Sequence, residues 1–241
     1  MDILQVWKRI GETPLEALER ATQEYDKKTK ACYTGRLDPM AQGVMTLLFG
    51  DQIHQSTTFN EKSKTYRFQA VLGISTTSYD AMGRITQVRP VSFTEAEAFT
   101  AKLLELTGEI TQVLPPCSAY RYKGKPLWVH EQNGTLPNPL PTKQVVVHSI
   151  KCLQPHPTTI MLDQYREQVL DDISSVSPEG NFDIVNILND WKELPSDHVI
   201  YRICIEAHVG SGTFVRSLVY DTARLLSIPA HAFRITRIST N

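Results

Sequence analysis

The sequence predicts an α+β fold whose sheet is largely antiparallel. Stretches rich in β-branched and aromatic residues outnumber those with helical periodicity, and hairpin-length or long connections separate them. A doubly wound parallel sheet would instead alternate strands with helices. With 241 residues, the chain is long enough to bury a sizeable core, as one large domain or two small ones.

Two sequences of the capping-box type mark helix starts. Thr13 is followed by a proline and by Glu16, a pattern in which Thr13 caps the helix and Glu16 bonds back to it. This helix is expected to run to about residue 26. Thr94 and Glu97 form a second box of this kind, ahead of apolar residues at helical spacing.

The remaining elements follow from composition and periodicity. The Gly-rich segment 210–216 leads into a further helix. The apolar run from Val44 to Phe49 is compatible with a buried strand or a buried helix. Strands are expected at residues 3–10, 66–73, 84–88, 144–153, 200–209 and 231–238.

The composition is that of an ordinary globular protein, with 41% hydrophobic and 21% charged residues. No apolar run has the length that spans a membrane, and the N-terminal residues lack the charged-then-apolar order of a signal peptide. The four cysteines lie far apart and form no CxxC pair, which argues against a zinc knuckle or a redox dithiol. We therefore expect an intracellular protein in a reducing compartment, with no membrane partner and no bound metal.

The net charge of −1 conceals an uneven distribution. Residues 157–198 include nine acidic and two basic residues, a net charge of −7, so the rest of the chain carries +6. A mildly basic body with an acidic insert is compatible with a polyanionic ligand on the body. The charges alone do not require such a ligand, since a charge run is usually a solvated face.

One loop carries a candidate catalytic carboxylate. Residues 34–44 read TGRLDPMAQGV, in which Gly35 and the Asp38-Pro39 pair predict a tight turn that runs directly into apolar sequence. A carboxylate held beside the core in this way can serve as a nucleophile, an acid or a base. The alternative is an Asx turn, in which the Asp38 side chain only accepts a bond from a nearby backbone N–H.

Two further segments carry charges that suggest a function. Arg216 stands in the first turns of a predicted helix, where the helix dipole disfavours a cation, so a carboxylate partner is expected there. Residues 114–125 interleave Tyr120 and Tyr122 with Arg and Lys, a pattern suited to base stacking beside phosphate contacts. An extended surface loop with amphipathic side chains explains these residues equally well.

Four motifs, in one order along the chain, resemble those of the TruB family of pseudouridine synthases. Residues 34–44 resemble its T-G-x-L-D-P-x-A-x-G-V signature, and residues 64–67 resemble its K-x-Y motif. Residues 73–83 resemble its G-x-x-T-x-T-x-D-x-x-G motif, and residues 212–221 its G-T-Y-I-R-x-L-x-x-D motif. The resemblance covers about residues 6–237, and details of the last two motifs look closer to the eukaryotic transfer-RNA uridine-55 branch.

The resemblance implies the pseudouridine synthase catalytic fold, a central mixed and mainly antiparallel sheet flanked by helices, with an RNA cleft across it. It implies a single catalytic domain over residues 1–241, with an acidic insert at about 157–198 and without the C-terminal PUA domain of many relatives. The implied activity is that of an isomerase, a transfer-RNA pseudouridine synthase that needs no cofactor. Its implied partner is the T-arm of tRNA, and uridine 55 would be flipped out of the T-loop.

The resemblance also assigns roles to residues. Asp38 matches the catalytic aspartate of the family, which acts as nucleophile or base on the sugar or the ring. Tyr66 matches the aromatic residue that stacks on the flipped base. Arg216 matches the arginine that pairs with the aspartate, which is the carboxylate partner already expected for it.

Three more positions are implied to bind substrate, two of them with altered residues. Phe214 replaces the tyrosine of the fourth motif and lacks its hydroxyl. Tyr33 stands where the bacterial family has a histidine that engages the RNA loop, so it would have to stack instead. Lys8 remains from a K-P-x-G motif whose proline is replaced by Arg9, and Cys117 replaces a further tyrosine.

Three hypotheses follow, in decreasing order of support. The first is an active synthase that modifies the T-loop of tRNA. The second is a TruB-like RNA chaperone that binds and refolds the loop after its chemistry has decayed, which the substitutions at Arg9, Tyr33 and Cys117 favour. The third is an α+β domain that binds a protein through the acidic insert. No heptad or apolar stripe suggests an oligomer, so we expect a monomer.

Overall fold

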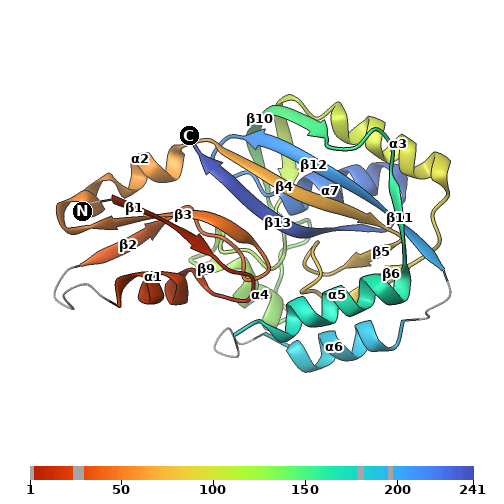
Figure 1. Cartoon of the computed structure of the whole chain (residues 1–241), viewed down its shortest axis with the longest axis horizontal. Helices are drawn as coiled ribbons and strands as arrows, with labels where there is room; N and C mark the ends of the chain where they lie inside the picture. Colours follow the sequence, from red (N-terminus) through yellow and green to blue (C-terminus); the bar gives the residue numbers. More distant parts are fainter. Residues whose placement is uncertain (1–2, 24–29, 178–181, 195–197) are drawn as a thin grey trace.

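The computed structural model describes residues 3–23, 30–177, 182–194 and 198–241, which form one large sheet with helices beside it (Figure 1). The strands of this sheet are β1 (Ile3–Lys8), β2 (Ala31–Thr34), β3 (Gln42–Phe49), β4 (Lys64–Leu72), β7 (Gly108–Val113), β10 (Thr142–Cys152), β11 (Thr158–Met161), β12 (Val199–Val209) and β13 (Ala230–Thr240). Two hairpins are separate from it, β5 (Ile74–Thr76) with β6 (Ile85–Val88), and β8 (Arg121–Tyr122) with β9 (Lys125–Pro126).

The described helices are α1 (Pro14–Thr22), η1 (Gly50–Gln55, a 3-10 helix), α2 (Ser56–Glu61), α3 (Phe93–Leu104), α4 (Leu127–Gln132), α5 (Leu162–Ser174), α6 (Ile184–Lys192) and α7 (Val215–Leu226). In this part of the chain, none of them combines the length and the apolar character needed to cross a membrane.

The topology of the large sheet confirms the expected α+β class. Its strand order is β1-β3-β13-β4-β12-β10-β7, and β2 pairs with β3 while β11 pairs with β12. These pairings are antiparallel, except that β13 runs parallel to β3. The parallel pair brings the C-terminal strand beside the strand that follows the Asp38 loop. The sheet is therefore mixed and mainly antiparallel, as the sequence predicted.

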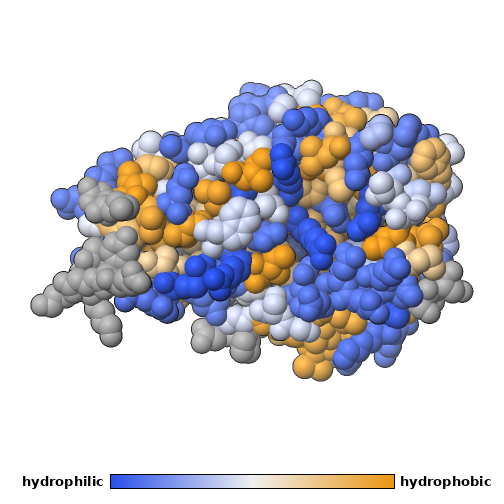
Figure 2. Space-filling view, viewed as in Figure 1, coloured by the Kyte–Doolittle hydropathy of each residue, from blue (hydrophilic) through white to orange (hydrophobic). Residues whose placement is uncertain are grey.

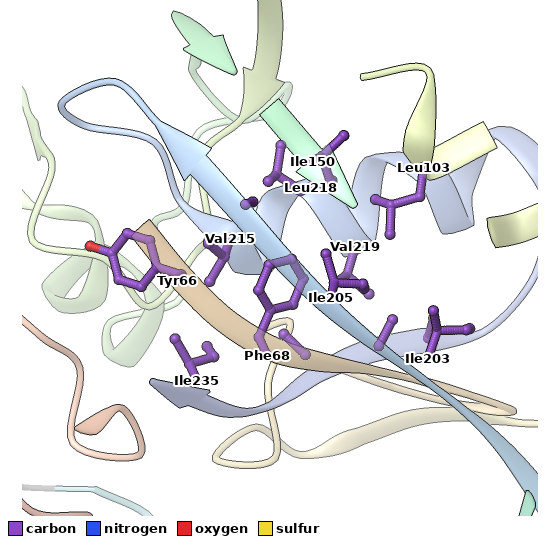
Figure 3. Close-up of a cluster of buried hydrophobic side chains, with 14 of the residues drawn as sticks. Tyr66, Phe68, Leu103, Ile150, Ile203, Ile205, Val215, Leu218, Val219 and Ile235 are labelled. Carbon is purple, nitrogen blue, oxygen red and sulfur yellow. The ribbon is translucent and has the colours of Figure 1, made fainter. Parts of the chain in front are cut away.

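Alternate residues of β4 face two different helical layers. Ala70 and Leu72 are buried in the cluster that contains residues of α3 and α7, whereas Val71 is buried in the cluster with α5 and α6. This is the period of two that a strand between two apolar layers requires. Figure 3 shows part of the first layer, where Phe68 and Ile205 of the sheet lie near Leu218 and Val219 of α7. Helices thus support the sheet on both faces.

The local predictions are confirmed except at one helix cap. Thr13 caps α1, with its hydroxyl accepting from the Glu16 N–H at 3.2 Å, and Val44–Phe49 is a strand within β3. The second capping box was misplaced by two residues. Ser92, not Thr94, caps α3: its hydroxyl accepts from the Glu95 N–H at 3.3 Å, and the Glu95 carboxylate accepts from the Ser92 N–H at 2.8 Å. The expected extension of α1 to residue 26 lies outside the described residues.

The acidic insert has a packed inner side. Residues 157–198 include β11, α5 and α6, and α5 buries one stripe of side chains at helical spacing, namely Leu162, Tyr165, Val169 and Ile173. The hydrophilic side chains cover the outward side of α5 (Figure 2). Glu167 and Asp171 are exposed on α5, opposite the apolar side that completes the second layer of the core.

Candidate active site

The Asp38 loop connects β2 to β3, and hydrogen bonds from the Lys8 side chain fix its backbone. The Lys8 ammonium donates to the backbone carbonyls of Arg9 at 3.0 Å, Pro39 at 3.1 Å and Ala41 at 2.6 Å. The Gly11 N–H also donates to the Pro39 carbonyl, at 3.0 Å. These bonds join the end of β1 to the loop that carries the candidate carboxylate.

The position of Lys8 corrects the substrate-binding role expected for it. Its side chain is fully buried, so it has no surface to offer a ligand, and burial lowers its pKa to about 8. Three carbonyl acceptors satisfy its three N–H donors. Lys8 is a positioning residue for the loop.

Replacement of this lysine tests that role. In Lys8→Met the three carbonyls lose the lysine donor, although that of Pro39 keeps the Gly11 N–H, and an unsatisfied buried acceptor costs about 1–3 kcal/mol. We expect a lower melting temperature and a slower catalytic step with little change in RNA affinity. Arg9→Met, at an exposed neighbour, is the control. Unchanged stability and turnover in Lys8→Met would contradict the role.

The Asp38 carboxylate pairs with Arg216, which confirms the carboxylate partner expected for this arginine. The Arg216 Nη2 atom lies 2.8 Å from Asp38 Oδ2, and the two side chains are 2% and 35% exposed respectively. A buried guanidinium thus holds a carboxylate that still reaches solvent. This geometry favours the functional interpretation of the loop over the Asx turn.

A second carboxylate, Asp80, completes the surroundings of Arg216. Asp80 Oδ2 lies 3.4 Å from Arg216 Nε, and Arg216 also donates to the carbonyls of Ser78 at 2.6 Å and Cys117 at 3.2 Å. Burial would lower the pKa of Arg216, but the charges of Asp38 and Asp80 outweigh it and raise this pKa. Burial likewise raises the pKa of Asp80, against the opposing charge of Arg216. The arginine is therefore locked between two carboxylates.

A cavity of about 250 Å³ opens beside this network. Its wall contains Asp38, Tyr66, Phe214 and Arg216, which come from a loop, from β4 and from the start of α7. Tyr66 is 9% exposed, and Figure 3 shows its ring at the end of the apolar cluster with the hydroxyl directed away from it. The structure thus brings together four of the residues expected at the site.

Tyr33, like Lys8, is an expected site residue that does not line this cavity. It lies in β2, opposite Leu47 of β3, and packs against the apolar cluster that contains Met45 and Leu47. Its side chain is half-buried. A contact between Tyr33 and RNA outside the cavity stays a prediction.

The same cavity contains two buried cations whose roles the sequence analysis missed. Arg237 is 1% exposed and donates to the carbonyls of Val44 and Gly35, both at 2.7 Å, while its Nη2 atom is buried without a hydrogen-bond partner. Lys64 donates to the carbonyls of Asn60 and Lys62, both at 2.6 Å. Burial and the charge of Arg237 lower the pKa of Lys64 to about 8. Two cations bonded to neutral carbonyls make this end of the cavity favourable for an anion.

A larger cavity, of about 670 Å³, reaches Asp38 from another direction. Segment 114–125 contributes Cys117 and Ala119 to it, α4 contributes Trp128, and α6 contributes Ile187. Asp38 thus lies where two cavities meet. Among the described residues, no group of three or more His, Cys, Asp or Glu side chains is placed to hold a metal ion.

Solved structures share the fold of this chain. The chain superposes on a structure described as a Cbf5-Nop10-Gar1 complex with a TM-score of 0.58, at 15% sequence identity, covering 99% of this chain and 48% of that one. A second, described as an H/ACA RNP bound to a substrate RNA containing 2′-deoxyuridine, gives a TM-score of 0.55 at 14% identity, covering 99% and 47%. The fold is the pseudouridine synthase catalytic fold.

Sequence comparison identifies the family. The model of the TruB family pseudouridylate synthase (N terminal domain) matches residues 23–167, and this chain belongs to the TruB family. A tRNA pseudouridine synthase B from Burkholderia mallei is 41% identical over 132 residues, which are 55% of this chain and 43% of that protein. A tRNA pseudouridine synthase B from Deinococcus deserti is 28% identical over 243 residues, covering 98% and 73%. The match to the Burkholderia relatives thus spans less than half of their length.

Proposed function

We propose that this protein is an RNA pseudouridine synthase and that Asp38 is its catalytic residue. The observation that carries the proposal is the partly exposed Asp38 carboxylate, held 2.8 Å from a buried arginine at the meeting point of two cavities. In the reaction, the N1–C1′ bond of uridine breaks, the uracil turns, and a C5–C1′ bond forms. The proton lost from C5 is balanced by the proton gained at N1.

Each residue of the site has a separate role in the proposed reaction. Asp38 acts as nucleophile or base, and Arg216 orients its carboxylate through the ion pair between them. Tyr66 lines the smaller cavity, where its ring can stack on the flipped uracil. Phe214 closes the wall beside it. Lys64 and Arg237 provide positive charge for a phosphate of the RNA backbone.

The substrate we propose is tRNA, modified at uridine 55 in the T-loop. The support is that the matching relatives are tRNA pseudouridine synthases B, together with the motif details that look closer to the uridine-55 branch. A stacked loop uridine must be flipped into the site, which costs a few kcal/mol, and backbone contacts to the cationic residues can offset this cost. We further propose a monomeric catalytic domain that works without a cofactor.

A single-turnover assay tests the proposal. The protein, in excess, is mixed with an unmodified tRNA transcript that carries C5-tritiated uridine, and released tritium is measured. We expect complete release of one equivalent per tRNA, with the modified position mapped to uridine 55. RNA binding without any release would favour the alternative, a TruB-like chaperone. A lack of RNA binding even at low salt would favour a protein-binding domain.

The charge on Lys64 predicts how RNA affinity depends on pH. A lysine whose pKa is about 8 is cationic at pH 7 and largely neutral at pH 9, so its attraction to phosphate is lost as the pH rises. We expect RNA affinity to fall by up to about tenfold between pH 7 and 9. Lys64→Arg keeps its charge over this range and is the control. Equal pH dependence in both proteins, measured by filter binding, would contradict the role of Lys64.

A further inference from the structure

The second helix of the acidic insert touches the turn that holds Arg216. Trp191 of α6 is fully buried, and its indole N–H donates to the carbonyl of Ala81 at 3.1 Å. The Asp190 carboxylate accepts two bonds from the Arg84 guanidinium, at 2.6 and 2.8 Å, and one from the Ile85 N–H at 3.1 Å. The turn formed by residues 77–84 is therefore bonded to α6 at two places. Trp191 contacts its interior, and Asp190 contacts its C-terminal end.

This turn supplies two of the four groups that surround the Arg216 guanidinium. They are the Ser78 carbonyl, at 2.6 Å, and the Asp80 carboxylate, at 3.4 Å. Asp80 is itself held inside the turn, because its Oδ1 atom accepts from the Ser78 hydroxyl at 2.6 Å and from the Met82 N–H at 3.0 Å. A displacement of the turn would therefore move the arginine, and the arginine orients Asp38.

The backbone of the turn has an unfavourable conformation at one residue and a very close approach at another. Tyr79 has a φ of 67°, in the left-handed region that costs a residue with a side chain roughly 1–2 kcal/mol. A Cβ atom at Gly83 would lie only 2.5 Å from the Ser78 N atom, so the chain passes very close to itself. The turn is thus tightly wound, and contacts from outside help to select its conformation over relaxed ones.

We propose that α6 is a positioning element for the active site, and that Trp191 and Asp190 hold the 77–84 turn so that Asp80 and Ser78 keep Arg216 directed at Asp38. The inference rests on the proposed function and deepens it. It assigns a role in the reaction to the acidic insert, whose charge alone indicated only a solvated face. Trp191 and Asp190 are positioning residues, because they touch the turn and not the reacting groups.

Conservative substitutions can distinguish this positioning role from a role in which α6 only buries apolar side chains of the core. Trp191→Phe keeps an aromatic ring in the buried layer but removes the N–H that reaches Ala81. Asp190→Asn keeps the shape of the side chain but removes the charge that binds Arg84. Lys192→Ala, at an exposed position on the same helix, is the control.

We expect the single-turnover rate to fall by about 10- to 100-fold in Trp191→Phe and Asp190→Asn, since a small misplacement of a catalytic group has effects of this size. RNA affinity should stay within about twofold, because neither side chain faces the smaller cavity with its cations. Lys192→Ala should match the wild type in both measurements. Asp190→Glu, which restores the charge, should recover part of the rate.

A double-mutant cycle shows whether the effect passes through the turn. In an Asp80→Asn background the link to Arg216 is already weakened, so Trp191→Phe should slow the reaction much less than it does in the wild type. Full additivity of the two effects would overturn the proposal. So would wild-type rates in both single variants, or a loss confined to RNA affinity.

A second measurement does not depend on activity. The buried Arg216 Nε–H should give a protected signal in ¹H–¹⁵N NMR spectra, assigned by its loss in Arg216→Lys. We expect this signal to shift in Trp191→Phe and Asp190→Asn but not in Lys192→Ala. A wild type that releases no tritium, together with these shifts, would refute the proposed function while supporting the positioning role. An unmoved signal would refute the positioning role alone.

Discussion

Asp38→Ala is expected to abolish pseudouridine formation, lowering the single-turnover rate of tritium release by at least about 10⁴-fold. The carboxylate is the group that reaches solvent from the Arg216 network, so no other acid in that network can replace it at the cavity wall. Asp80 carries the second carboxylate, but its side chain is only 7% exposed and is engaged by Arg216 and Ser78.

The fold should survive this substitution. Asp38 is 35% exposed, and Arg216 keeps Asp80 and two backbone carbonyls as partners. RNA affinity should therefore change little. Asp38→Asn, which keeps the shape and loses the charge, should be equally inactive, and Asp51→Asn, at an exposed position, is the control. Tritium release at the wild-type rate from Asp38→Ala would remove Asp38 from the mechanism.

Arg216→Met is expected to have the second-largest effect, because it damages both the reaction and the fold. It leaves Asp80, which is deeply buried, without its cation, and breaking a buried ion pair in this way costs about 3–5 kcal/mol. The reaction rate should fall by at least about 10³-fold, since electrostatic support of a catalytic group accounts for effects of this size. Thermal unfolding and single-turnover assays measure the two consequences.

Two further variants separate the charge of Arg216 from its shape. Arg216→Lys keeps the charge, but a point charge on a flexible chain cannot reproduce the fork that contacts two carboxylates and two carbonyls. It should recover stability in part and activity very little. Arg216→Met combined with Asp80→Asn removes both buried charges and should recover stability without activity. Full activity in Arg216→Lys would show that charge alone is sufficient.

The predictions made from sequence succeeded where the deciding residues are neighbours along the chain. Thr13 and Glu16 are three positions apart, so the cap of α1 depends on one turn of backbone. The Ser92 cap was missed because Thr94 offers the same short pattern two residues later, and only the packed helix distinguishes them. The partner type of Arg216 was also predictable, because a cation near a helix N-terminus needs compensation.

The tertiary structure decided what depends on residues far apart in the chain. Arg216 and Ser78 are separated by 138 positions and Arg237 and Gly35 by 202, and no local pattern encodes such a pairing. Lys8 also shows that a local pattern does not predict long-range contacts, because a contact was expected there that the structure does not contain. The family motif implied a ligand contact for it, whereas the packing of β1 against the loop buries it, with bonds to three carbonyls.

The sequence by itself determined the α+β class, the family resemblance, the Asp38 loop and the need of Arg216 for a carboxylate. These features follow from residue order and spacing, because side-chain periodicity, turn chemistry and caps act over a few positions. Only the tertiary structure decided that Asp80 shares Arg216 and that α6 supports their turn. The physical reason is that burial and pairing of charges depend on which distant segments the sheet brings together.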